Sequence, residues 1–429
     1  MEQSLRAQLR EILHQEVVLA TGCTEPGAVA LCVAKSRELL GEMPDSVEVL
    51  MSKNVFKNAM GVGIPGTGMI GLPIAVAMAL NSGRSERQLE VLMLPEQEVS
   101  QAKEWLANNA DRIHIGVKET SDKLYIESTC RKGDQTAQAV IAKRHTNFVF
   151  LSRNGKILSA SSDANNCGQS AAATASAQPS VVLTARMVYE YATTAPLEEL
   201  EFIRETVKYN VAASKEGLKG YGLHAGEILN MNASGDIVHT VVARTVAASD
   251  ARMDGCTLPI YSNSGSGNQG IACTVPVYEY GTLKHCSDEQ ITRALILSHL
   301  MSIYVKRGIG RLSALCGIVN ASIGVTSGIV FLHGGSFDQI GYAVKNMINT
   351  LAGMVCDGAK PSCALKMSTG LYSAFVCAEL AYHGHVVDAT DGLSERDLDE
   401  SIHNLGRLGH DGMNQTDDVV LDIMTHKKS

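Results

Sequence analysis

Hydrophobic residues recur at the spacing of one helix face over residues 4–20, at the start of the chain. Gly22 ends this helix, and Pro26 suits the first turn of a second helix over about 26–40, because its missing N–H group is not needed there. Residues 1–43 are therefore predicted to form two N-terminal helices that pack on the larger, helical part of the chain.

Residues 44–158 follow a different pattern. Polar and apolar residues alternate over 46–51, as in a half-buried strand, and an apolar helix (about 69–80) and a charged helix (about 84–109) follow. Four more strands, separated by turn residues, are predicted at 113–117, 124–129, 138–143 and 147–152. This order of elements indicates an α+β module with an antiparallel sheet.

Residues 159–429 begin with an Ala-, Ser-, Asn- and Gln-rich linker (159–179), after which helical periodicity dominates. A less regular stretch is predicted over about 220–285. Helices are predicted near 181–192, 197–215, 287–306, 309–332, 337–355, 362–384, 395–408 and 414–426. The fold class is therefore α+β, with a largely helical domain and a smaller α+β module.

Composition narrows the classes of partner. A chain of 429 residues with 45% hydrophobic content can bury a large core, and a net charge of −8 without a long basic block argues against nucleic acid. The uncharged run 312–332 is long enough to span a membrane, but serines, glycines and an asparagine interrupt it, which favours a buried helix and no membrane partner. A homodimer is left open.

Cysteine usage points to a reducing compartment. The polar N-terminus lacks the apolar segment of a secretory signal, and eleven cysteines without such a signal argue against a disulfide framework. A cytoplasmic protein with reduced thiols is predicted, so each cysteine serves metal binding, catalysis or plain burial.

Three late cysteines are the strongest candidates for chemistry. Cys356 falls at a predicted helix end, Cys363 in the first turn of the next helix, and Cys316 on the preceding uncharged helical run. Three thiolates suit an iron–sulfur cluster with one open iron, and helix N–H groups and Lys360 can offset its negative charge. The spacing alone is weakly specific, because buried apolar cysteines give the same pattern. Cys23 lies near a helix N-terminus, where the helix dipole is expected to lower a thiol pKa.

Two glycine-rich segments, 66–71 and 265–270, fit the pattern G-x-G-x-x-G, but neither follows a plausible buried strand, so nucleotide binding is not predicted. The second lies in a segment rich in neutral hydrogen-bond donors, which suit a substrate carboxylate or an anionic intermediate as well as a solvated loop. These donors are Ser262, Asn263, Ser264, Ser266, Asn268 and Gln269.

Other catalytic patterns are missing from the sequence. There is no H-E-x-x-H zinc motif and no G-x-S-x-G nucleophile motif. Asp250, Arg252 and Asp254 lie close together in sequence and are interpreted as a local ion-pair turn.

Four segments together resemble the L-cysteine desulfidase family, which is related to the α chain of iron–sulfur L-serine dehydratases. They are 21–26 (TGCTEP), 65–69 (PGTGM), 262–270 (SNSGSGNQG) and 354–364 (MVCDGAKPSCA). The resemblance implies a 4Fe–4S cluster on Cys316, Cys356 and Cys363, with Cys23 as proton acceptor. The implied reaction is β-elimination of L-cysteine, with its thiolate on the open iron, to sulfide, ammonia and pyruvate.

Three alternatives stay open beside this reading. The first is L-serine dehydration on the same scaffold, although the separate carboxylate-recognising segment of the serine dehydratases is not recognisable here. The second is a PLP-dependent lyase with Lys360 or Lys366 as the Schiff-base lysine. The third is a cluster-bearing redox sensor without turnover.

Overall fold

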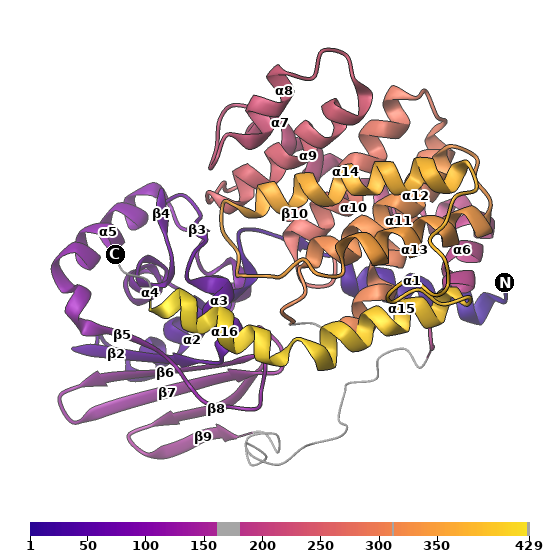
Figure 1. Ribbon diagram of the computed structural model, residues 1–429. Helices are drawn as coiled ribbons and strands as arrows, with labels where there is room; N and C mark the ends of the chain where they lie inside the picture. Colours follow the sequence, from indigo (N-terminus) through magenta and orange to yellow (C-terminus); the bar gives the residue numbers. More distant parts are fainter. Residues whose placement is uncertain (161–180, 311–312, 427–429) are drawn as a thin grey trace.

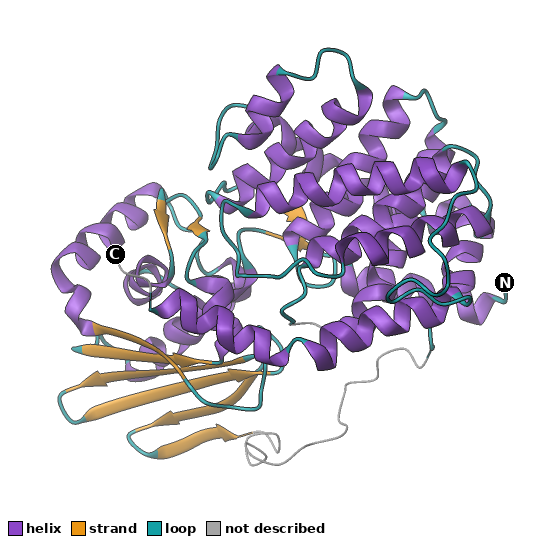
Figure 2. Cartoon of the chain, viewed as in Figure 1, coloured by secondary structure: helices purple, strands orange, loops and turns teal. Residues whose placement is uncertain are grey.

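Two hydrophobic cores organise the chain, one among helices and one between helices and a sheet (Figures 1 and 2). The computed structural model describes residues 1–160, 181–310 and 313–426. The predicted α+β class is confirmed. The division into three domains remains a prediction.

The helical body contains most of the longer helices. They are α1 (Gln3–Glu16), α6 (Ala185–Thr194), α7 (Arg204–Gly217), α8 (Ala225–Met231), α9 (Ile237–Met253), α10 (Gly267–Leu283), α11 (Asp288–Ile309), α12 (Gly317–Leu332), α13 (Phe337–Leu351), α14 (Cys363–Tyr382) and α15 (Leu398–Arg407). Short turns at Leu197–Glu199, Glu201–Ile203 and Leu408–Gly412 connect some of them.

Helix α12 is the centre of this body and packs against α10, α11, α13 and α14. Its residues are buried almost without exception, which explains the uncharged run in the sequence. No helix in the part of the chain that the structure describes has the length and apolarity needed to cross a membrane.

The second body is a six-stranded sheet covered on one face by helices (Figure 2). Its strands, in spatial order, are β5 (Ile113–Val117), β2 (Ser46–Met51), β6 (Tyr125–Lys132), β7 (Gln135–Ala142), β8 (Phe148–Arg153) and β9 (Lys156–Ala160). The covering helices are α2 (Thr24–Leu40), α3 (Lys53–Ala59), α4 (Leu72–Asn81) and α5 (Glu96–Asn109).

The sheet is mixed rather than purely antiparallel. β2 and β5 pair in parallel, with Val47 opposite Ile113, whereas the other neighbours are antiparallel. A parallel pair needs a long crossover connection, and α3, α4 and α5 supply it.

Two sequence predictions need correction here. α2 was expected to pack with α1 on the helical body, but residues 28–34 of α2 are buried on all sides, and α2 packs between the sheet and α4. The stretch 220–285 was expected to be irregular, yet it forms α8, α9 and α10. The predicted linker 159–179 lies outside the described residues, apart from Ser159 and Ala160, which end β9.

Contacts between the bodies include two pairs of regular elements. The short strands β1 (Leu19–Ala20) and β10 (Ile260–Tyr261) pair, so the segment before Cys23 lies beside the segment that leads into α10. The last helix, α16 (Asn414–Thr425), leaves the helical body and packs on α3 (Figure 1). Both contacts bring segments from the two bodies to one place.

Candidate functional site

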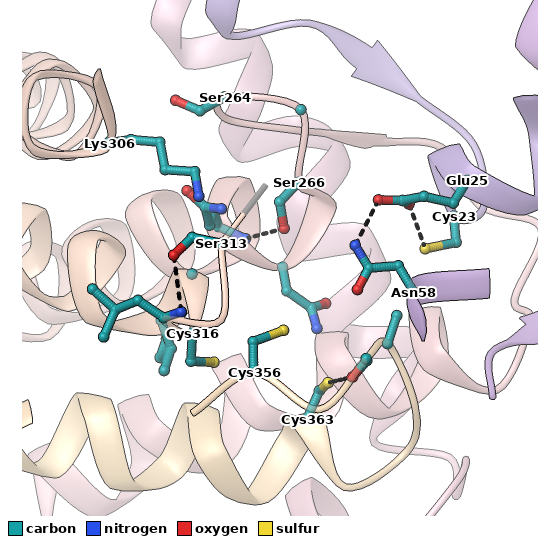
Figure 3. Close-up of a pocket in the computed structure, with 18 of the residues that line it drawn as sticks. Cys23, Glu25, Asn58, Ser264, Ser266, Lys306, Ser313, Cys316, Cys356 and Cys363 are labelled. Atoms are coloured by element: carbon teal, nitrogen blue, oxygen red, sulfur yellow. Dashed lines mark hydrogen bonds between the residues drawn. The ribbon is translucent and has the colours of Figure 1, made fainter. Parts of the chain in front are cut away.

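A cavity of about 400 Å³ lies where the two bodies meet. The sheet body lines it with residues that include Glu25, Asn58, Lys143 and His145, and the helical body with the beginnings of α10, α12 and α14. Cys23, Cys316, Cys356 and Cys363 all line this cavity. Figure 3 shows the sulfurs of the last three gathered along one wall, with Cys23 and Glu25 on the other side.

A short antiparallel bridge brings Cys316 and Cys356 together across forty residues of sequence. The amide of Cys316 donates to the carbonyl of Met354 (2.9 Å), and the amide of Cys356 donates to the carbonyl of Ala314 (2.6 Å). Cys316 was predicted within a helix, but it is the N-cap residue just before α12. The bridge holds this N-cap beside the segment that follows α13.

Cys363 is the first residue of α14, as the sequence predicted, and its thiol contacts the carbonyl of Gly358 at 3.6 Å. The N-terminal ends of α12 and α14 therefore both adjoin a cysteine of the trio. Free amide groups at such ends favour negative charge. Lys360, which was expected to add a cation, forms an ion pair with Asp357, and so does Lys366.

The donor set suits an iron–sulfur cluster better than a single ion. Burial and, after it, the nearby Cys356 and Cys363 raise the pKa of the Cys316 thiol to about 12, so the three thiols lie within electrostatic reach of one another. Among the described residues, no three His, Cys, Asp or Glu side chains are close enough to share one metal ion. A cubane cluster takes each cysteine on a different iron, which requires a wider spacing. The three thiols, which line one wall of the cavity, are therefore the kind of donor set that such a cluster requires.

Cys23 has a different environment from the trio. It is the N-cap residue of α2, and its Sγ contacts Oε2 of Glu25 at 3.6 Å, while Oε1 of Glu25 accepts a hydrogen bond from Asn58 (3.1 Å). Burial and then the Glu25 carboxylate raise the pKa of Cys23 to about 12, against a smaller lowering by Arg252. The expected lowering by the helix dipole is therefore wrong, because loss of hydration outweighs it.

The donor-rich segment 262–270 divides into two parts. Ser264, Ser266, Asn268 and Gln269 line the cavity. Gly267 already begins α10, with Ser266 as its N-cap, so half of the predicted loop is the first turn of a helix. The cavity therefore meets a helix N-terminus as well as neutral side chains.

Ser262 and Asn263 do not line the cavity, contrary to expectation. The Ser262 hydroxyl donates to the carbonyl of Val18 (2.9 Å), and the Asn263 amide donates to His299 Nδ1 (3.1 Å) and to the His299 carbonyl (3.2 Å). Oδ1 of Asn263 in turn accepts from the Ser264 hydroxyl (2.9 Å). Both residues hold the segment in place rather than face a ligand.

Sequence reasoning missed two buried cations in the lining, Arg252 and Lys306, which are 7% and 6% exposed. Arg252 was interpreted as part of a local ion-pair turn. However, Asp250 accepts from the amide of Gly226 (2.8 Å), and Asp254 accepts from that of Gly222 (3.2 Å). Burial lowers the pKa of Lys306 to about 8, while the nearby Cys356 and Cys316 raise it.

A family model for the serine dehydratase alpha chain matches residues 84–422. The protein belongs to this family, whose members are lyase-type enzymes. The chain is also 49% identical to a UPF0597 protein of Phocaeicola vulgatus, over 99% of this chain and 98% of that protein. It is 48% identical to one of Bacteroides thetaiotaomicron (100% and 99% covered) and 43% identical to one of Aeromonas hydrophila (97% and 95%). These names state no substrate or cofactor.

Proposed function

We propose that the protein is an L-cysteine desulfidase, a carbon–sulfur lyase that converts L-cysteine to sulfide, ammonia and pyruvate. We further propose that Cys316, Cys356 and Cys363 hold a 4Fe–4S cluster and that Cys23 is the proton acceptor. One observation carries the proposal: four cysteines from separate segments line a single cavity. Membership of the serine dehydratase family, which is generally iron–sulfur related, supports both the reaction class and the cofactor.

A cluster with an open iron, when bound, supplies a Lewis acid for the leaving sulfur. The chain itself must take the α-proton while the C–S bond breaks. Cys23 lines the cavity opposite the trio and is suited to this step as a thiolate (Figure 3). The resulting aminoacrylate tautomerises and reacts with water to give pyruvate and ammonia, which completes the balance of atoms.

The contacts of Cys23 with Glu25 and Arg252 set the resting state of the thiol. Because the pKa of Cys23 is raised, the residue rests as a neutral thiol and must lose its proton before it can act. Oε2 of Glu25, 3.6 Å from Sγ, accepts from the thiol and favours its protonated form, whereas the charge of Arg252 favours the thiolate; Asn58 holds the carboxylate by its other oxygen. A thiolate of high pKa is in turn a strong base toward the substrate.

L-Serine dehydration is the second candidate, and one observation favours it. The sequence showed no separate carboxylate-recognising segment, which counted against serine. In the structure the sheet body supplies Asp122, Lys123, Lys143 and His145 to the lining. A second structural unit therefore does reach the cavity, as the serine alternative requires.

The PLP alternative has less support. Both lysines considered for a Schiff base, Lys360 and Lys366, are paired with Asp357. Burial acts to lower the pKa of Lys366, but the bond to Asp357 raises it overall, whereas a Schiff-base lysine must be neutral to attack.

The test is an anaerobic assay of reconstituted protein with L-cysteine and L-serine. We expect pyruvate and sulfide from L-cysteine, a fall of about 10²–10⁴-fold in Cys23→Ala, and no change in Cys286→Ala, whose thiol does not line the cavity. Pyruvate mainly from L-serine would reverse the substrate assignment, and no product from either amino acid would refute the lyase.

A further inference from the structure

Arg252 is a buried cation without an anionic partner. It is 7% exposed, and no acidic residue in the described ranges forms an ion pair with it. Its Nη1 and Nη2 contact neutral oxygens, at Asn268 Oδ1 (3.4 Å) and the carbonyl of Gly22 (3.3 Å), and the guanidinium also interacts with the side chain of Cys23, which is a neutral thiol at rest. Its Nε is buried and has no hydrogen-bond partner. Burial of a charge in this state is costly, and proteins normally offset it with a paired anion.

The guanidinium lies in the cavity lining, close to the N-terminus of the seventeen-residue helix α10. It bonds to Asn268 in the first turn of that helix and is near enough to Cys23 to influence it electrostatically. Amides at a helix N-terminus and a guanidinium fork are both suited to a carboxylate. An anion bound here would lie beside the residue proposed to take the α-proton.

Gly267 keeps the space that Arg252 occupies. A Cβ atom at this position would lie 2.1 Å from Arg252 Nε and 2.6 Å from Cζ, so no other residue fits beside the guanidinium as it stands. Glycine is therefore needed at this position of the G-x-G-x-x-G pattern because it makes room for Arg252, and nucleotide binding is not needed to explain it.

We propose that Arg252, together with the first turn of α10, binds the α-carboxylate of the amino-acid substrate. Gly267 leaves the space in which the Arg252 guanidinium lies. This inference rests on the proposed function for the class of ligand, an α-amino acid. Arg252 would supply the positive charge that binds the carboxylate, which the neutral side chains of 264–269 do not supply.

The test measures binding rather than turnover. Isothermal titration of the anaerobically loaded protein uses L-alanine, which carries the carboxylate but no leaving group, and L-alaninamide, which lacks the negative charge. We expect L-alanine to bind in clear preference to the amide. Arg252→Gln should weaken L-alanine about tenfold or more, and Arg252→Lys should restore part of the affinity, because it keeps the charge without the planar fork.

Arg244→Gln is the matched control on the same helix, since Arg244 pairs with Glu279 and does not line the cavity. It should leave L-alanine binding unchanged and lower the unfolding temperature. Arg252→Gln should leave that temperature unchanged or raise it, because it removes an unpaired buried charge. Gly267→Ala keeps the arginine but displaces its side chain, so it should also weaken the binding of L-alanine.

Three results would overturn the proposal. They are equal binding of L-alanine and L-alaninamide by the unmodified protein, undiminished L-alanine binding by Arg252→Gln, and a loss of stability in Arg252→Gln like that of the control. None of these measurements depends on product formation. The carboxylate-binding role of Arg252 and the proposed reaction can therefore be refuted independently of each other.

Discussion

Helix α16 joins the two bodies through a buried ion pair. Removing one partner of this pair should lower the free energy of unfolding by a predictable amount. Lys57 on α3 is only 2% exposed and pairs with Asp417 on α16, which is 13% exposed. Oδ2 of Asp417 also accepts from Asn54 (3.0 Å). The next residue, Asp418, pairs with Lys53 at the surface, where the two side chains are 58% and 35% exposed. Two adjacent aspartates thus make the same kind of contact in opposite surroundings.

Asp417→Asn should leave the ammonium group of Lys57 buried without its counter-charge. Breaking a buried pair by removing one partner costs about 3–5 kcal/mol, and the partial exposure of Asp417 favours the lower end, about 3 kcal/mol. With an unfolding entropy of about 2.1 cal/mol/K per residue, a chain of 429 residues that unfolds as one unit loses about 1 °C per kcal/mol. The expected fall in unfolding temperature is therefore about 3 °C.

The assay is thermal and urea unfolding of Asp417→Asn, Asp418→Asn and the double variant Lys57→Met/Asp417→Asn. Asp418→Asn should cost at most about 1 kcal/mol, because exposed pairs are screened by water. The double variant should recover most of the loss, because it removes the stranded charge. Equal effects of the two aspartate variants, or a double variant less stable than Asp417→Asn, would refute the reasoning.

Three further predictions follow from single side chains. Glu25→Gln removes the negative charge that raises the pKa of Cys23, so iodoacetamide should alkylate Cys23 faster at pH 9, as read by peptide mass spectrometry; an unchanged or slower rate would contradict this. Burial lowers the pKa of His299 to about 3, so below pH 6.5 the unfolded chain takes up a proton that the folded one refuses, and stability should fall by up to about 1.4 kcal/mol per pH unit. Urea unfolding at pH 7 and pH 5 should show a smaller drop in His299→Gln, and an identical drop would remove His299 as a cause. Gly358→Ala should destabilise the cysteine loop by more than 1 kcal/mol or so, since Gly358 has φ +94° and an added Cβ would lie 2.2 Å from the carbonyl of Lys57; unchanged unfolding would exclude that strain.

The regular parts of the fold could be predicted from periodicity. β2 and β5 begin and end at the predicted residues, since their alternating or continuous apolar patterns have turn residues on both sides. β9 was missed because all five of its residues are exposed, so an edge strand leaves no pattern of burial in the sequence.

Helix α10 could not be predicted from its composition. It contains glycines and an internal proline, Pro276, which propensity alone counts against a helix. Close packing explains the glycines, because a Cβ at Gly270 would lie 1.9 Å from the carbonyl of Tyr261. Tertiary contacts outweigh local propensity here, and no local pattern records them.

The candidate site was partly visible in the sequence. The thiols could be proposed from their types and spacing, but the bridge that aligns Cys316 with Cys356 is a long-range contact without a local signal. Arg252 was missed because Asp250 and Asp254 flank it in sequence, and only the fold shows that both carboxylates bind backbone amides elsewhere. Burial likewise reversed the direction expected for the pKa of Cys23.

Iron and acid-labile sulfide, counted per chain after anaerobic reconstitution, test the proposed cluster most directly. About four of each are expected for the unmodified protein and for Cys286→Ala, with a loss of both in Cys316→Ala, Cys356→Ala and Cys363→Ala. A protein that takes up no iron, or single variants that keep the full amount, would contradict the assignment of these three thiols.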